Sequence, residues 1–168
     1  MIRIGIGFDA HRFSETDENR PLKLMGVHVP FDFGLAGHSD ADVMLHALID
    51  ALLGAAGLGD IGRHFPDTDA SYRGMDSTEL LKSVVLKIHS EGWRVANADV
   101  GLIGENPKIA AHSQAMRDLI APILGIQKGA LNIKATTTEK MGFAGRGEGL
   151  AAQAVALLSG DPGTAATV

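Results

Sequence analysis

The hydrophobic and polar positions of residues 2–11 alternate strictly, which is typical of a strand with two different faces. The isoleucines and Phe8 form one face, and the other carries two glycines and two polar side chains, namely Gly5, Gly7, Asp9 and His11. The paired glycines indicate that another element packs close to the strand backbone. Shorter patterns predict a hairpin around Gly26 over residues 22–30, and strands over residues 93–103 and 131–138.

Residues 38–54 are apolar almost all round, which predicts a buried helix with Ser39 as its N-cap. One polar stripe interrupts this pattern, because Asp42, His46 and Asp50 are spaced i, i+4, i+8 and share a face. A buried polar stripe needs partners, since an unpaired buried charge is expensive. A histidine satisfied by a neighbouring aspartate is the simplest explanation for His46 alone.

The remaining pattern predicts a helix over residues 77–90 and another that opens at Asn106–Pro107 and ends near Gly125. Residues 150–158 fit either a helix or a strand. We find no internal repeat and no linker, so we expect a single domain over residues 1–158 and a flexible tail over residues 159–168. The order of elements predicts an α/β (α+β) fold with helices on one face of a sheet.

Composition narrows the possible chemistry. The net charge of −5 argues against nucleic acid as a main partner, because duplex binding depends on dense Lys and Arg. The chain has no Cys, so a transition metal would have to be held by His and carboxylates. The first residues look like a strand rather than a signal peptide, and the sequence has no membrane-length apolar run. We therefore expect a cytoplasmic protein.

Polar side chains on two different elements together suggest a metal site. Asp9 and His11 project from the end of the first strand, and His46 projects from the buried helix. Two histidines and one carboxylate with an open fourth position form a catalytic zinc arrangement. Asp42 or Asp50, each one turn from His46, could orient it. The alternative interpretation of Asp9 and His11 is an ion pair between them at the protein surface.

A second cluster lies at residues 136–140, where three threonines precede Glu139 and Lys140. Hydroxyls beside a carboxylate suit phosphate oxygens and a hard Mg²⁺ or Mn²⁺ ion. An ordinary Thr-rich strand end with a solvated Glu–Lys pair is the alternative. Pro107 and Lys108 could hold a phosphate or a base edge, or could simply cap a helix.

Six segments resemble the 2-C-methyl-D-erythritol 2,4-cyclodiphosphate synthase family, and the resemblance covers about residues 2–158, apart from loop 14–21. The segments are GFDAH at 7–11, HSDADVMLH at 38–46, GDIG at 59–62, FPDTD at 65–69, PK at 107–108 and KATTTEKMGFAGRGEG at 134–149. The resemblance implies a mixed four-stranded sheet with helices on one face, assembled as a homotrimer with active sites at subunit interfaces. It also implies that residues 150–158 form a strand.

The resemblance further implies a lyase of the non-mevalonate pathway. The substrate would be 4-diphosphocytidyl-2-C-methyl-D-erythritol 2-phosphate, and the products the cyclic diphosphate and CMP. Zn²⁺ would be held by Asp9, His11 and His46, and Mg²⁺ or Mn²⁺ by Glu139 with the substrate diphosphate. His38 and Thr137 would be catalytic.

The same resemblance implies three groups of substrate-binding residues. Around the phosphates and the methylerythritol these are Asp9, His11, His38, Ser39, Asp60, Ile61, Gly62, Phe65, Pro66, Asp67, Thr68 and Asp69. Around the cytidine and the second ion they are Pro107, Lys108, Thr136, Thr137, Thr138 and Glu139. Phe143 and Arg146 would line the ligand side of the interface.

Two rival functions stay open. A phosphodiesterase that uses zinc hydroxide needs the same metal triad, but it would consume water and give acyclic phosphates. A non-catalytic trimer that binds a small molecule would not require Glu139 and the triad together.

Overall fold

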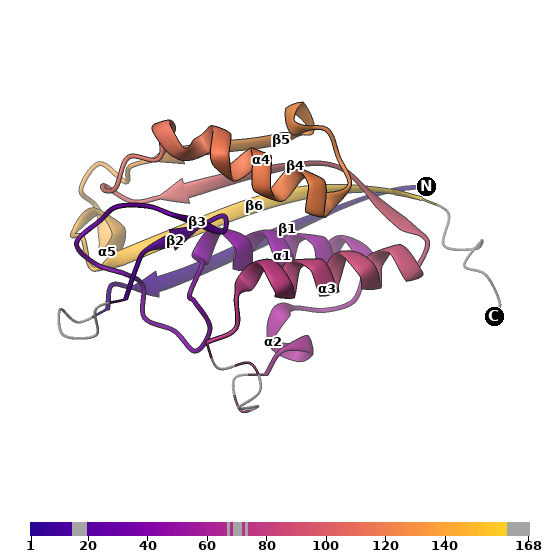
Figure 1. Cartoon of the computed structure of the whole chain (residues 1–168), viewed down its shortest axis with the longest axis horizontal. Coiled ribbons are helices and arrows are strands. Elements are labelled where there is room, and N and C mark those ends of the chain that lie inside the picture. The colour runs from indigo at the N-terminus through magenta and orange to yellow at the C-terminus, as the bar shows by residue number, and fades with distance from the viewer. Residues whose placement is uncertain (15–19, 67, 69–71, 73, 161–168) are drawn as a thin grey trace.

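The computed structural model of the chain describes residues 1–14, 20–66, 68, 72 and 74–160 (Figure 1). A four-stranded sheet runs through the molecule in the order β1-β6-β4-β5. Its strands are β1 (Ile2–Arg12), β4 (Trp93–Ile103), β5 (Leu131–Thr136) and β6 (Gly149–Gly160). β6 is antiparallel to both of its neighbours, and β5 is parallel to β4, so the sheet is mixed as predicted.

Three long helices cover one face of this sheet (Figure 1). α1 (Val43–Ala56) lies against β1 and β6, α3 (Ser77–Ser90) against α1 and β4, and α4 (Ser113–Leu124) against β5. The short elements are β2 (Lys23–Leu24), β3 (Val27–His28), α2 (Ile61–His64), α5 (Gly142–Gly145) and the 3₁₀ turns η2 (Ala110–His112) and η3 (Lys128–Ala130). Within the described residues, no helix is long and apolar enough to cross a membrane.

The glycine face of β1 meets α1 directly, as the sequence predicted. A Cβ on Gly5 would overlap the Ala51 carbonyl, and a Cβ on Gly7 would overlap the Ala47 carbonyl. The helix therefore lies on the strand backbone itself, and side chains at the end of β1 come within reach of the first turn of α1. The opposite face of β1 is uncovered in the single chain: Ile2, Ile4, Ile6 and Phe8 are exposed.

The predicted start of the central helix is wrong. α1 begins at Val43, and its N-cap is Asp42 instead of Ser39. The Asp42 carboxylate accepts hydrogen bonds from the backbone N–H groups of Leu45, Met25 and Gly26, and the side chain is fully buried. It thus joins the β2–β3 hairpin to the helix start, and these additional donors explain why the cap lies at Asp42.

The prediction of a helix opening at Pro107 is also wrong. The Asn106–Pro107 peptide is cis, the chain forms a loop there, and α4 begins at Ser113 after η2. An Asn–Pro pair is as typical of a turn as of a helix start, so the pattern alone did not separate the two.

The C-terminal region is a strand, as the resemblance implied. β6 settles the helix-or-strand ambiguity of residues 150–158 and continues to Gly160. Ser159 and Gly160, which were assigned to the tail, therefore belong to the sheet. The rest of the predicted tail lies outside the described residues.

Candidate metal centre and active site

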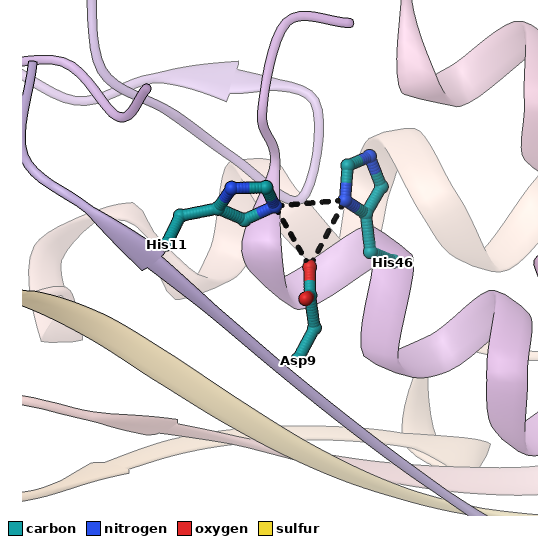
Figure 2. A group of neighbouring side chains, drawn as sticks. All are labelled: Asp9, His11 and His46. Atoms are coloured by element: carbon teal, nitrogen blue, oxygen red, sulfur yellow. Dashed lines mark hydrogen bonds and ion pairs between the residues drawn. The ribbon is translucent and has the colours of Figure 1, made fainter. Parts of the chain in front are cut away.

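Three side chains meet between the end of β1 and the start of α1 (Figure 2). Asp9 Oδ2 lies 2.9 Å from His11 Nε2 and 3.0 Å from His46 Nδ1, and the two nitrogens are 3.2 Å apart. Strand alternation puts Asp9 and His11 on the helix side of β1, and the glycine contact brings His46 down to them. One oxygen and two nitrogens thus converge on a single point, which is the arrangement that holds a cation.

The chemistry of the donor set fits zinc. His11 Nδ1 lies 2.8 Å from the Ala36 carbonyl oxygen, which can only accept, so Nδ1 carries the proton and a neutral His11 presents the Nε2 lone pair. His46 turns its other nitrogen, Nε2, toward the hydroxyls of Ser39 and Ser77. Two imidazoles and one carboxylate leave a fourth position for water or substrate.

The group that orients His46 is different from the predicted one. Asp42 uses its carboxylate to cap α1, and Asp50 accepts a hydrogen bond from Ile61 N at 2.7 Å. Ser77, the first residue of α3, contacts His46 instead. Sequence reasoning missed Ser77, because a serine next to a helix cap gives no indication of a contact with a residue 31 positions away.

Asp9 and His11 each shift the pKa of the other toward its charged form. Burial acts to raise the pKa of Asp9, but hydrogen bonds from His11 and His46 hold it well below its ordinary value. Burial acts to lower the pKa of His11, but the hydrogen bond and charge of Asp9 raise it above its ordinary value. Asp9 is therefore ready to bind as a carboxylate. The Asp–His ion pair considered for β1 uses the same atoms as the metal site.

The triad opens into a cavity of about 360 Å³. The residues predicted from the sequence that line it are Asp9, His11, His38, Ser39, His46, Ile61, Gly62, Phe65 and Thr68. The lining also includes Asp50, which the sequence indicated only as a residue that could orient His46, and two side chains that the sequence did not indicate, Tyr72 and Leu80. The rings of Phe65 and Tyr72 meet edge to face at 5.4 Å and form an apolar wall. The cavity therefore joins a polar, metal-binding floor to an apolar side.

Some predicted residues of this region lie elsewhere. The Asp60 carboxylate caps α2 by accepting from Arg63 N, and neither Asp60 nor Pro66 is part of the cavity lining. Asp67 and Asp69 lie outside the described residues.

The threonine cluster lies at the opposite edge of the sheet from Asp9. Strand register sets Asp9 opposite Ala152, Ala152 opposite Leu102, and Leu102 opposite Ala135, the residue before Thr136. Three strand spacings of about 4.8 Å put the two ends of this row roughly 14 Å apart. None of the predicted residues from 107 to 146 lines the cavity: Pro107, Lys108, Thr136, Thr137, Thr138, Glu139, Phe143 and Arg146.

Glu139 projects from an unusual piece of backbone. Glu139 and Lys140 both have left-handed φ values, of 52° and 63°. Glu105 Oε1 accepts from the backbone N–H groups of Thr138 at 3.3 Å and Lys140 at 3.1 Å, and so bridges Glu139. A non-glycine residue holds such a conformation only when its surroundings enforce it. Glu105, which sequence reasoning did not identify as a site residue, provides this support.

Comparison with known proteins identifies relatives of this chain over nearly its whole length. The family model described as the YgbB family matches residues 2–159. A Methylococcus capsulatus protein named 2-C-methyl-D-erythritol 2,4-cyclodiphosphate synthase is 59% identical over 95% of this chain and 99% of its own length.

Solved structures agree in fold. The bifunctional IspDF of Campylobacter jejuni matches with a TM-score of 0.90 and 45% identity over 96% of this chain, which spans 43% of that longer chain. The Plasmodium falciparum IspF in complex with CDP matches with a TM-score of 0.82 and 31% identity over 95% of this chain and 97% of its own. With a family model that covers nearly all of its residues, this chain belongs to the YgbB family.

Proposed function

We propose that this chain converts 4-diphosphocytidyl-2-C-methyl-D-erythritol 2-phosphate to 2-C-methyl-D-erythritol 2,4-cyclodiphosphate and CMP. The observation that carries the proposal is the convergence of Asp9, His11 and His46 beside one cavity in a chain of the YgbB family. Relatives that match over nearly their whole length are named as synthases of this cyclic diphosphate. The chain is thus a phosphorus–oxygen lyase of the non-mevalonate route to isoprenoid precursors.

Asp9, His11 and His46 would hold Zn²⁺, and Glu139 would hold Mg²⁺ or Mn²⁺ together with the substrate diphosphate. Bound divalent ions supply Lewis acidity, which polarises phosphoryl oxygens and offsets their charge. The donor set supports zinc at the triad, and the exposed carboxylate of Glu139 beside the Thr137 hydroxyl supports a hard cation there.

The remaining residues would position the reacting groups. The attacking 2-phosphate oxygen is already an anion, so the reaction needs alignment and charge stabilisation more than a strong base. His38 and Thr137 would stabilise the transition state, and Ser39 would hold a phosphate. Ile61, Gly62, Phe65 and Thr68 line the cavity that would receive the methylerythritol, with Asp60, Pro66, Asp67 and Asp69 nearby in sequence.

The cytidine part would be held by Pro107, Lys108 and Thr136, with Thr138 beside them and Phe143 and Arg146 at the interface. In one chain Thr136, the last residue of β5, lies at the opposite sheet edge from the triad. An active site shared between two subunits would bring one chain's triad to the other chain's cytidine site. The CDP bound by the Plasmodium falciparum relative supports a cytidine ligand.

The uncovered sheet face supports the homotrimer. Ile2, Ile4, Ile6 and Phe8 are between 57% and 71% exposed, and Val155 of the neighbouring strand is 37% exposed. A continuous apolar face of this kind marks a protein–protein interface. Packing three such faces around one axis would bury it. Gly5 and Gly7 do not belong to this interface, because α1 occupies their side of β1. The cytoplasmic location stays a prediction.

The test is incubation with the diphosphocytidyl substrate, Mg²⁺ and Zn²⁺, followed by chromatography of the products. We expect CMP and the cyclic diphosphate in equal amounts. A phosphodiesterase would release acyclic phosphates and incorporate ¹⁸O from labelled water, and a binding protein would release no CMP. The His46→Ala variant is the control, because we expect about one zinc per wild-type chain by elemental analysis and none in this variant.

A further inference from the structure

We propose that Ser77 and Asp40 are positioning residues for the metal site, because together they determine which nitrogen of His46 faces the metal. Neither residue lines the cavity, and neither belongs to the ligand set. The inference rests on the proposed function, since it concerns a ligand of the proposed zinc site.

The argument begins with the single proton of the Ser77 hydroxyl. Ser77 Oγ donates to Asp40 Oδ1 at 2.5 Å, and Ser77 N donates to Asp40 Oδ2 at 3.2 Å. A carboxylate can only accept, so the hydroxyl proton is committed to Asp40. Ser77 Oγ therefore turns a lone pair toward His46 Nε2, which lies 3.0 Å away. This hydrogen bond forms only if Nε2 is the protonated nitrogen of His46.

A proton on Nε2 of His46 also determines the state of Nδ1, the ring nitrogen on the metal side. A neutral imidazole carries one proton, so a proton on Nε2 leaves the lone pair on Nδ1. Nδ1 is the atom that faces Asp9 and His11. The relay Asp40–Ser77–His46 thus selects the metal-binding tautomer and fixes the plane of the ring. A hydrogen-bond acceptor behind a metal-bound histidine also makes it a stronger ligand.

The surrounding protein holds both Ser77 and Asp40 in place. Ser77 is fully buried at the start of α3. The Lys23 ammonium lies 3.3 Å from Asp40 Oδ2 and 2.8 Å from Asp76 Oδ2, so the Asp40 carboxylate has a positive partner on β2. The hairpin, the loop before α1 and the start of α3 therefore converge on one ligand of the metal.

Ser39 also contacts His46 Nε2, at 3.2 Å, but its situation differs. Ser39 lines the cavity and accepts a hydrogen bond from Ala41 N, and we assign it to a substrate phosphate. Its hydroxyl proton is not committed to a carboxylate. Ser39 can therefore bond to His46 in either tautomer, whereas Ser77 can do so in only one.

The first test is the zinc affinity of Ser77→Ala, measured by competition with a chromophoric chelator. We expect affinity to fall about 10- to 100-fold, as is typical when the hydrogen-bond partner of a metal-bound histidine is removed. Thr78→Ala is the matched control at the same helix start, because the Thr78 hydroxyl donates to Asp76 at 2.6 Å. This control should bind zinc as the wild type does. The visible spectrum of the Co²⁺-loaded protein should change in Ser77→Ala only.

Asp40→Asn is the second test, and it reverses the direction of the relay. Asp40 Oδ2 faces two donors, Ser77 N at 3.2 Å and the Lys23 ammonium at 3.3 Å. Apart from the Ser77 hydroxyl, Oδ1 faces only the more distant Asp42 N at 3.4 Å. The asparagine oxygen therefore takes the Oδ2 position, and its NH₂ faces Ser77 Oγ. The Ser77 proton then turns to His46 Nε2 and favours the tautomer with a proton on Nδ1. We expect zinc affinity to fall at least as far as in Ser77→Ala.

The outcomes separate the relay from the function itself. If the wild-type chain binds no zinc, the proposed metal site fails and the relay fails with it. If the wild type binds zinc and releases CMP, but both variants retain zinc affinity within about twofold, the relay alone is overturned. Ser77→Ala that regains CMP release in excess zinc supports the relay, because positioning acts on metal binding and not on the substrate.

Discussion

The backbone carbonyl of Ala47 in α1 lies directly over Gly7 of β1, with no room for a side chain between them. Gly5 and the Ala51 carbonyl repeat the contact one helical turn further along. These two contacts fix the height of the helix above the sheet. Since His46 precedes Ala47 and Asp9 lies two residues after Gly7, they also fix the distance between these two metal-binding side chains.

Gly7→Ala is therefore expected to reduce both stability and zinc affinity. The new Cβ overlaps main-chain atoms, which cannot move aside as a flexible side chain can, so the helix must shift. Overpacking of this kind typically reduces the free energy of unfolding by about 1–3 kcal/mol. Urea unfolding of the zinc-free protein measures the first effect, and chelator competition measures the second.

Gly129→Ala is the control for Gly7→Ala, because a Cβ at Gly129 meets nothing within 4 Å. We expect its unfolding free energy to change by less than about 0.5 kcal/mol, with unchanged zinc affinity. Equal behaviour of the two variants would show that the close contact does not control the site.

Local patterns in the sequence were sufficient for most of the fold. The alternation of residues 2–11 predicted β1, and the pattern of residues 77–90 predicted α3 at both ends. In both cases the pattern within the element itself is enough to predict it. The start of α1 could not be predicted in this way, because Asp42 is selected as the cap by contacts with a hairpin some 16 residues earlier.

In the site, too, local patterns could be predicted and contacts between distant residues could not. Asp9 and His11 share a strand face by alternation, so their pairing could be predicted, and a polar residue on a buried helix marked His46. Ser77 and Glu105 could not be identified, because each acts through contacts with residues more than 30 positions away. Such contacts depend on how the elements pack, and sequence spacing does not encode them.

The charge of Asp76 should stabilise the fold in a pH-dependent way. Burial acts to raise its pKa, but Lys23 and Thr78 lower it from 3.8 to about 2. A lowered folded-state pKa contributes stability that is present above about pH 4 and is lost as the pH falls toward 2. Because the side chain is 43% exposed, we expect Asp76→Asn to reduce the unfolding free energy at pH 7 by only about 1 kcal/mol.

Urea unfolding of wild type and Asp76→Asn at several pH values between 2 and 7 measures this difference. It should shrink below pH 4 and also shrink in high salt, which screens the Lys23 interaction. A difference that stays constant with pH would contradict the role of the Asp76 charge.

The apolar face of β1 should hold the proposed trimer together. Ile4→Glu puts a charge in the centre of this face, and since burying an unpaired charge is costly, we expect the variant to sediment as a monomer. Leu86→Glu is the control, because Leu86 is 70% exposed on α3 and lies on the helix side of the sheet. Sedimentation equilibrium at micromolar concentration makes the measurement. A monomeric wild type would contradict the trimer, and a trimeric Ile4→Glu would place the interface elsewhere.

Glu139→Gln should abolish turnover and leave zinc in place. Glu139 lies at the opposite edge of the sheet from the triad, and we assign it to a second ion that arrives with the diphosphate. The substitution removes the charge that holds this ion, while Glu105 can still support the backbone around position 139. The charge on the departing CMP then lacks compensation.

An electrostatic contribution of this kind is typically worth about 3 kcal/mol or more, so we expect CMP release to fall roughly a hundredfold or further. Glutamine is nearly isosteric with glutamate, so folding and oligomer mass should be unchanged. Glu91→Gln removes a charge from the exposed end of α3 and is the matched control. Zinc content, sedimentation and CMP release are measured on the same preparations. Near-normal CMP release, or a loss of zinc along with activity, would mean that the two ions are not divided between Glu139 and the triad.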